Sequence, residues 1–219
     1  RRQRQMCIRD RRFFHDGAGY FLKYHGGIGW REISKNISQG KLPVVGAMQE
    51  VRAINAVRAA GLDTMTVAGY GWRGRNPARQ ESFLVTDELV NTLSLEEVGE
   101  AWLKTGNVPV VFKQQLIRRV AEIARRMHRA GINHRDFYLA HFLMPVVAVQ
   151  QRDATAPLFL IDLHRSQVRH SVPRRWRVKD LGGLYFSSAR FGLTRRDMLR
   201  FVREYSGLPS VSYTHLTLP

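Results

Sequence analysis

The sequence predicts an α+β fold with two lobes, because strands and one helix fill its first part and a mostly helical half with one small hairpin follows. Hydrophobic residues make up 44% of the 219 residues, which is enough to build a packed core. No stretch approaches the roughly 20 uninterrupted apolar residues that a membrane-spanning helix needs. The single cysteine, Cys7, excludes a disulfide framework within the chain and fits a reducing cytoplasm.

The first lobe is expected to open with a hairpin over residues 11–24, because Asp16-Gly17 lies between two aromatic-rich runs. Residues 26–43 are expected to form a loop, with a glycine pair early and Pro43 late. The other elements predicted for this lobe are a helix at about 46–60 that ends at Gly61, a strand at 67–70 and a strand at 82–86.

The second lobe is expected to begin with a short helix at Ser94, which can form a capping box with Glu97. The clearest helix is predicted over residues 113–130, where one apolar stripe faces the core and five arginines lie largely off it. The apolar stripe consists of Leu116, Ile117, Val120, Ile123, Ala124 and Met127. The remaining predicted elements are two short strands at about 142–149 and 157–163, and two helices at about 180–189 and 194–206.

The boundary between the lobes is expected near residues 87–91, just after the strand that ends at Thr86. The first ten residues show no periodicity and the last ten follow a finished helix, so both ends are expected to be non-native tails. The predicted divisions are a tail at 1–10, an incomplete N-lobe at 11–90, a C-lobe at 91–209 that carries the catalytic loop, and a tail at 210–219.

Positive charge is the strongest compositional signal. The 35 Lys and Arg residues outnumber 18 Asp and Glu residues, which gives a net charge of +17. Such a surface favours nucleic acid, an anionic membrane surface or phosphorylated substrates, with a solvated basic surface as the alternative. Residues 164–179 concentrate this charge without any acid, and arginine forks suit phosphate or carboxylate recognition. The cations of this segment are Arg165, Arg169, Arg174, Arg175, Arg177 and Lys179.

Four charged residues provide the groups that phosphoryl transfer needs, and they occur along the chain in a kinase-like order. That chemistry needs a cation on the nucleotide phosphates, a carboxylate for magnesium and a carboxylate near the attacking hydroxyl. Lys23 lies on a predicted strand, and Glu50 lies on the next helix, where it could pair with Lys23 and fix its direction. Asp136 closes a His134-Arg135-Asp136 triplet, and Asp162 ends a predicted strand 26 residues later. The two aspartates could therefore face each other across a cleft.

Each of these residues alone is a weak signal. A single Lys on a strand is usually a solvated edge residue, and a Glu on a helix usually lies on the surface. A short triplet such as His-Arg-Asp is only a hypothesis until its structural context agrees. The ordered set of four is much harder to explain by chance, and it favours a kinase-like cleft.

At these residues the chain resembles the lipopolysaccharide core heptose(I) kinases of the WaaP type, within the protein-kinase-like superfamily. The resemblance runs from about residue 11 to residue 209. The matching stretches are Tyr20-Phe21-Leu22-Lys23, Ala130-Gly131-Ile132-Asn133-His134-Arg135-Asp136, His141-Phe142-Leu143, Ile161-Asp162-Leu163-His164-Arg165, Val172-Pro173-Arg174-Arg175-Trp176-Arg177, Asp180-Leu181 and Gly183-Leu184-Tyr185-Phe186-Ser187-Ser188.

The resemblance implies a protein-kinase-like fold and ATP-dependent phosphorylation of the first heptose of the lipopolysaccharide inner core, with Mg²⁺ as the metal. It places this reaction in the cytoplasm, at the cytoplasmic face of the inner membrane of a Gram-negative bacterium, with peripheral contact to the anionic membrane. The acceptor would be a lipid-linked anionic core oligosaccharide rather than nucleic acid. It also implies a monomer and a folding partner such as acyl carrier protein.

The resemblance also implies roles for individual residues. Lys23 would contact the nucleotide phosphates, and Glu50 would orient it. Asp136, with Arg135 and His134 in its triplet, would align the sugar hydroxyl. The remaining implied residues are Asp162 and His141 for the metal, the backbone of Val85, Thr86, Asp87, Glu88 and Leu89 for adenine, and Arg165, Arg169, Arg174, Arg175 and Arg177 for the substrate.

Three departures from protein kinases qualify these roles. His141 stands where a metal-binding Asn is usual, and imidazole is a poor ligand for magnesium, so we expect one well-held metal rather than two. Leu163-His164 replaces the usual Phe-Gly. No G-x-G-x-x-G motif precedes the first hairpin, and the resembling family extends beyond residue 209, so we expect a chain truncated at both ends that binds nucleotide weakly as it stands.

Two other readings of the sequence stay open. The chain could be a kinase-like phosphotransferase for another small molecule or for protein. It could also be non-catalytic, either as a basic nucleic-acid-binding protein or as a pseudokinase scaffold. A nucleic-acid reader motif is missing, and that reading leaves the positions of Asp136 and Asp162 unexplained.

Overall fold

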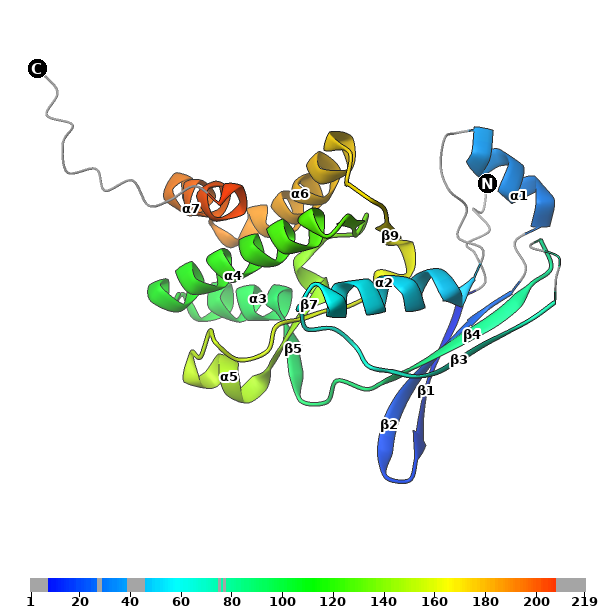
Figure 1. The fold of residues 1–219 in the computed structure, drawn as a ribbon. Helices are drawn as coiled ribbons and strands as arrows, with labels where there is room; N and C mark the ends of the chain where they lie inside the picture. Colours follow the sequence, from blue (N-terminus) through cyan, green and yellow to red (C-terminus); the bar gives the residue numbers. More distant parts are fainter. Residues whose placement is uncertain (1–7, 27–28, 39–45, 75, 77, 208–219) are drawn as a thin grey trace, which may run out of the picture.

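A computed structural model describes residues 8–26, 29–38, 46–74, 76 and 78–207. The predicted α+β fold with a protein-kinase-like arrangement is confirmed. Figure 1 shows a twisted antiparallel sheet at one end of the molecule and a group of helices at the other, with one helix lying between them.

The sheet has four strands in the order β1-β2-β4-β3, and all of its neighbours are antiparallel. The predicted hairpin and both later strands are present, and the hairpin turns at Asp16 and Gly17, which have φ angles of 48° and 77°. Residues 8–10 pair with the second strand, so they belong to the sheet and not to a tail outside the fold. The strands are β1 (Ile8–His15), β2 (Ala18–His25), β3 (Val67–Arg73) and β4 (Glu81–Asp87).

Two helices accompany the sheet. Helix α1 (Gly29–Ser38) lies within the segment predicted as a loop, so that prediction is wrong for these residues, and residues 39–43 lie outside the described part of the chain. The glycine pair suggested a loop, but it only precedes the helix, in which the apolar residues Trp30, Ile33 and Ile37 recur at helical spacing. Helix α2 (Ala47–Ala59) confirms the helix predicted at about 46–60. It buries Ile54 and Val57 in a core that also contains Leu84 of the sheet.

The helical half begins with α3 (Leu95–Thr105), whose predicted capping box is present. Its backbone N–H at Glu97 donates to Ser94 Oγ at 3.2 Å, while the Ser94 N–H donates to the Glu97 carboxylate at 2.7 Å. The other helices of this half are α4 (Val110–Arg129), α5 (Val146–Gln151), α6 (Arg174–Ser188) and α7 (Arg195–Ser206). No helix in the described ranges is both long and apolar enough to cross a membrane.

Three sequence predictions for this half need correction. The strand predicted at 142–149 ends at Pro145, the N-cap of α5, although the valines that follow favour a strand, because its partner β5 begins opposite Pro145 and offers no further strand residues. The strand predicted at 157–163 keeps only two residues in the ladder. Helix α6 starts six residues earlier than predicted, right after Pro173, so part of the basic segment is helical.

Short strands in the helical half hold together two loops that are far apart in sequence. These strands are β5 (Thr92–Ser94), β6 (Ile132–Asn133), β7 (Phe142–Pro145), β8 (Phe159–Leu160) and β9 (Gln167–Val168). Strand β6 pairs with β9, and β7 pairs with β8. The loop at 134–141 and the loop at 161–166 are each bounded by these two pairings, so they must lie side by side.

Candidate active site

The two loops contact each other directly through hydrogen bonds. The Ile161 N–H donates to the His141 carbonyl at 3.0 Å, and His134 Nε2 lies 2.9 Å from the Ile161 carbonyl. Gly131 makes the approach possible, because its φ is +77° and an added Cβ would lie 1.9 Å from the Arg169 carbonyl oxygen. The fold therefore fixes the two loops to within hydrogen-bonding distance.

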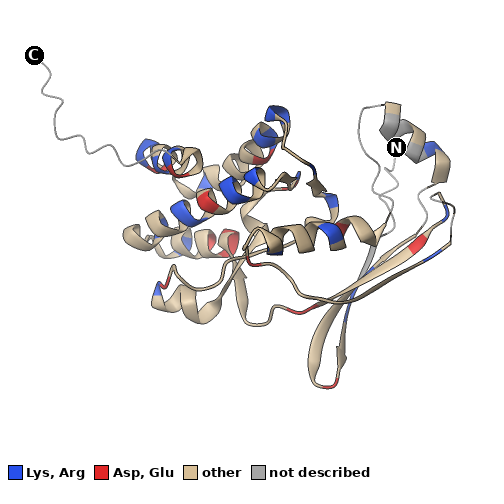
Figure 2. Cartoon of the chain, in the orientation of Figure 1, with Lys and Arg blue, Asp and Glu red and all other residues tan. Residues whose placement is uncertain are grey.

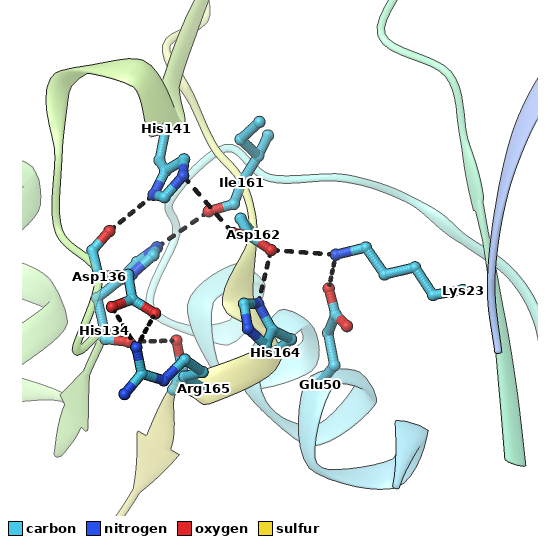
Figure 3. A network of polar contacts seen from close by, with 10 residues as sticks. Lys23, Glu50, His134, Asp136, His141, Ile161, Asp162, His164 and Arg165 are labelled. Atoms are coloured by element: carbon cyan, nitrogen blue, oxygen red, sulfur yellow. Dashed lines mark hydrogen bonds and ion pairs between the residues drawn. The ribbon is translucent and has the colours of Figure 1, made fainter. Parts of the chain in front are cut away.

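Lys23 reaches this junction from the sheet (Figure 3). Its Nζ lies 2.8 Å from Glu50 Oε1, so the predicted pairing of Lys23 with Glu50 is confirmed, and 3.2 Å from Asp162 Oδ1. Burial lowers the pKa of Lys23, but the charges of Glu50 and Asp162 outweigh it and raise that pKa. Burial raises the pKa of Glu50, with Lys23 acting against it. The ammonium group is therefore charged at neutral pH.

Asp162 lies at the centre of this polar network. It has a left-handed backbone with φ 59°, which turns its side chain towards Lys23, and its Oδ1 lies 2.7 Å from His164 Nδ1. Burial alone would raise the pKa of Asp162. The hydrogen bond from His164 and the charge of Lys23 outweigh burial and hold this pKa well below its usual range. Asp162 is thus an ionised carboxylate at neutral pH.

The donor set at Asp162 fits one magnesium ion better than two. Within the described residues, no group of three or more His, Cys, Asp and Glu side chains could hold a metal by itself. Magnesium is commonly held by one or two carboxylates together with substrate phosphates and water, which a single ionised Asp162 can support. His141 Nε2 lies 3.5 Å from Asp162 Oδ2, and its Nδ1 lies 2.7 Å from the Asp136 carbonyl. The imidazole therefore links the two loops.

Asp136 lies on the first loop, with its side chain 15% exposed. Arg165 Nη1 donates to both carboxylate oxygens of Asp136, at 2.7 and 2.9 Å. The spacing of these residues in the sequence gave no sign of this ion pair. The carboxylate that the sequence assigned to the acceptor hydroxyl is thus held by an arginine of the neighbouring loop (Figure 3).

Asp180 is a site residue that sequence reasoning missed. It is fully buried on α6, and its two oxygens accept the backbone N–H groups of His134 at 2.7 Å and Arg135 at 2.8 Å. Arg135 has a left-handed φ of 75°, which these bonds help to hold. His128 Nε2 also lies 3.2 Å from Asp180. In the sequence, the only signal for Asp180 was that the stretch Asp180-Leu181 matches the heptose kinase family.

His134 is a neutral structural imidazole. Burial lowers its pKa to about 4, against the hydrogen bond to the Ile161 carbonyl, and its ring stacks on His141 with centroids 5.6 Å apart. Because the Ile161 oxygen can only accept, Nε2 carries the proton. The charge of the triplet therefore resides on Arg135 and Asp136.

Only part of the segment predicted to bind adenine has backbone N–H groups left for a ligand. Val85 and Thr86 lie inside β4, between β2 and β3, so their backbone groups serve the sheet. The Asp87 N–H donates to the Thr66 carbonyl at 3.0 Å, and the Glu88 N–H donates to the Gly19 carbonyl at 2.9 Å. Among the described residues, the chain from Leu89 onward is therefore where N–H groups remain for a ligand.

The arginines predicted to bind substrate fall into two groups. Arg165, Arg169 and Arg175 lie near Asp136 or near Trp176, which α6 places beside the loop at 134–141. Arg174 is exposed at the start of α6, and Arg177 lies beside Tyr205. The structure thus brings together three of the five. Figure 2 shows that Lys and Arg also follow α4 and α7.

An apolar cavity of about 310 Å³ lies apart from this polar network, among α3, α4, α6 and α7. Its lining includes Trp102, Leu116, Leu184, Tyr185 and Phe201. Exposed apolar side chains continue from it across α6 and α7, with Phe186 80% exposed and Leu199 60% exposed. This surface is a second feature that the sequence did not predict.

Known proteins match this chain over most of its length. The profile of the lipopolysaccharide kinase (Kdo/WaaP) family matches residues 4–205. The lipopolysaccharide core heptose(I) kinase WaaP of Pseudomonas aeruginosa is 51% identical over 198 residues, covering 89% of this chain and 72% of the relative. The enzyme of the same name from Escherichia coli K12 is 47% identical over 199 residues, covering 90% and 74%.

A solved structure, WaaP in complex with acyl carrier protein, matches the fold with a TM-score of 0.77. It is 42% identical, and the match covers 95% of this chain and 78% of that one. The resemblance predicted from the sequence is therefore confirmed. The chain belongs to the lipopolysaccharide kinase (Kdo/WaaP) family.

Proposed function

We propose that this protein is an ATP-dependent kinase that phosphorylates heptose(I) of the lipopolysaccharide core. Three relatives that are 46–51% identical over about nine-tenths of the chain carry the name of that activity. The observation that carries the proposal is the meeting of Lys23, Asp162 and the Asp136 loop at one junction. That arrangement supplies a cation, a metal carboxylate and a carboxylate for the acceptor within reach of one phosphoryl group.

Each side chain has a separate task in this proposal. Lys23 neutralises nucleotide phosphates, and Glu50 directs it from α2 at 2.8 Å. Asp162 holds magnesium, which neutralises charge on the transferred phosphoryl group when it is bound. Asp136 orients the heptose hydroxyl and accepts its proton as the oxygen attacks. The nucleotide would lie between the lobes at 11–90 and 91–209, with adenine near Leu89.

The partners of this chain also belong to the proposal. The acceptor would be a lipid-linked, anionic core oligosaccharide, reached from the cytoplasmic face of the inner membrane by peripheral contact. We further expect acyl carrier protein to bind, since a structural neighbour is in complex with it. The apolar cavity among α3, α4, α6 and α7 offers room for an acyl chain, and a net charge of +17 favours acidic partners.

The test is phosphoryl transfer from ATP to two purified core lipids, one ending in heptose(I) and one ending before it. We expect product only on the heptose-bearing lipid, with the phosphate located by phosphorus NMR. Asp136→Asn should lower turnover about a thousandfold, because it removes the proton acceptor. Arg118→Ala, an exposed change on α4, is the matched control and should keep full turnover. Equal labelling of both lipids would contradict the proposal.

A further inference from the structure

Trp176 gathers an unusual number of positive charges. Two guanidinium groups of the loops, Arg135 and Arg169, lie 5.4 and 6.0 Å from its ring centroid. Arg175 and Lys179, both on α6, lie 5.3 and 5.4 Å from the same centroid. One indole cannot neutralise four cations, because each cation–π contact offsets only part of a single charge's desolvation.

Burial and neighbouring like charges both act against the charged forms of this cluster. Burial lowers the pKa of Arg135, and the charge of Arg165 lowers it further. Burial also lowers the pKa of Lys179, and so do the charges of Arg135 and Arg165. The carboxylates of Asp136 and Asp180 face the cluster, but Asp180 already accepts two backbone N–H groups. Positive charge thus exceeds negative charge beside Asp136.

Buried hydrogen-bond donors without an acceptor give a second, independent indication of an anionic ligand. Arg135 Nε, Arg169 Nε and Trp176 Nε1 are buried, and no acceptor pairs with any of them among the described residues. Arg135 as a whole is only 8% exposed. Buried donors are normally hydrogen-bonded, so three open donors in one cluster call for a ligand that only accepts. Carboxylate and phosphate groups are such ligands, and arginine forks match both.

We propose that Arg135, Arg165, Arg169, Lys179 and Trp176 form a binding site for an anionic group of the acceptor, a carboxylate or a phosphate. This inference rests on the proposed function, and it narrows the acceptor to one with an acidic group close to the reacting hydroxyl. Of the five predicted substrate arginines, Arg165 and Arg169 belong to this anion site, while Arg174, Arg175 and Arg177 do not.

Arg165 connects the anion site to catalysis. Its Nη1 donates to both oxygens of Asp136, and this paired positive charge makes the carboxylate a weaker acceptor for a hydroxyl proton. An anion bound by Arg135 and Lys179 competes for Arg165 and draws it away from Asp136. A neutral acceptor would leave Arg165 in place. The anionic group therefore selects the acceptor through turnover as well as through binding.

Binding is tested first without any turnover, by the Trp emission of the whole protein titrated with inorganic phosphate or with acetate at constant ionic strength. We expect a saturable change that Trp176→Phe abolishes and that the double variant Arg169→Gln, Lys179→Gln weakens at least tenfold. Arg118→Ala should bind like the wild type. The stronger of the two anions identifies the phosphate or the carboxylate source. An unchanged affinity in the double variant, or no saturable change with either anion, would overturn the site.

Turnover is then compared on two heptose-bearing acceptors, one acidic and one with its acidic groups neutralised by reduction or dephosphorylation. We expect the double variant to raise the acceptor KM about tenfold or more on the acidic acceptor, with an unchanged KM for ATP. Arg165→Gln should narrow the difference in kcat between the two acceptors. Equal kcat and KM of the wild type on both acceptors would refute the inference. Absence of transfer to any heptose acceptor would instead refute the proposed function, while phosphate binding at Trp176 would stand.

Discussion

Replacing Asp180 with asparagine removes one of two acceptors that hold the loop before Asp136. The Asp180 oxygens bind the N–H groups of His134 at 2.7 Å and Arg135 at 2.8 Å, in a fully buried position. Asparagine keeps one oxygen and turns an NH₂ group towards the other donor. One lost charge-assisted hydrogen bond and one unpaired donor together cost about 2–4 kcal/mol of unfolding free energy. Asp180→Ala, which loses both bonds, should cost about 3–6 kcal/mol.

The same change should slow catalysis, because Arg135 and Asp136 would no longer be held in position. We expect kcat for phosphoryl transfer to fall about a hundredfold in Asp180→Asn, as misplacement of a reacting group does. The KM for ATP should stay near the wild-type value. Urea unfolding and steady-state kinetics measure these quantities. Glu122→Gln is the acid-to-amide control, since both side chains of its 3.6 Å pair with Arg126 are more than 40% exposed. Wild-type stability and kcat in Asp180→Asn would refute the reasoning.

Three further outcomes follow from the same geometry. Glu50→Gln removes the 2.8 Å partner that directs Lys23, so the KM for ATP should rise about tenfold while the acceptor KM stays constant, as initial rates would record. Folding lowers the pKa of His134 from 6.5 to about 4, so between these two pH values the unfolded chain binds more protons than the folded one. The free energy of unfolding should therefore drop by up to about 3 kcal/mol as the pH falls from 6.5 to about 4. His134→Gln should flatten this pH dependence in urea titrations. Gly131→Ala should lower the free energy of unfolding by about 3 kcal/mol or more, as the same urea titrations would show. The control Gly106→Ala, at a φ of +65° with open space around it, should lower it by only about 1 kcal/mol. Equal losses in the two variants would contradict the close contact at Gly131.

Local signals in the sequence predicted much of the fold correctly. The Asp16-Gly17 turn and the capping box at Ser94 are short-range features, because their geometry depends on a few neighbouring residues. The pairing of Lys23 with Glu50 was also predicted from their order in the chain, and it is present although α1 lies between β2 and α2. The match to a known family extended these local signals to the whole fold.

The predictions failed where distant residues decide the structure. The valines of α5 favour a strand, but the partner strand β5 begins opposite Pro145, so the ladder ends there and the chain turns into a helix. The start of α6 was missed because its charge density suggested a loop, while Pro173 is an ordinary residue before a helix. The bonds of Asp180 and the pairing of Arg165 with Asp136 join residues 29 or more apart in sequence. No local pattern can encode them.

The role of His141 shows how geometry refines a sequence expectation. The sequence left it as a doubtful second metal ligand. Its two ring nitrogens lie 2.7 Å from the Asp136 carbonyl and 3.5 Å from Asp162 Oδ2, so the ring ties the two loops together. This arrangement favours a single magnesium ion at Asp162, which stays a proposal until metal binding is measured.

The most direct test of the whole account is calorimetric binding of ATP with and without Mg²⁺, paired with single-turnover transfer to the heptose acceptor. Asp162→Asn should lose the magnesium-dependent part of ATP binding, because the ionised carboxylate proposed to hold the metal is gone. Asp136→Asn should bind Mg²⁺ and ATP like the wild type and yet fail to transfer phosphate. Magnesium-dependent ATP binding that survives in Asp162→Asn, or normal transfer by Asp136→Asn, would contradict the division of work between the two aspartates.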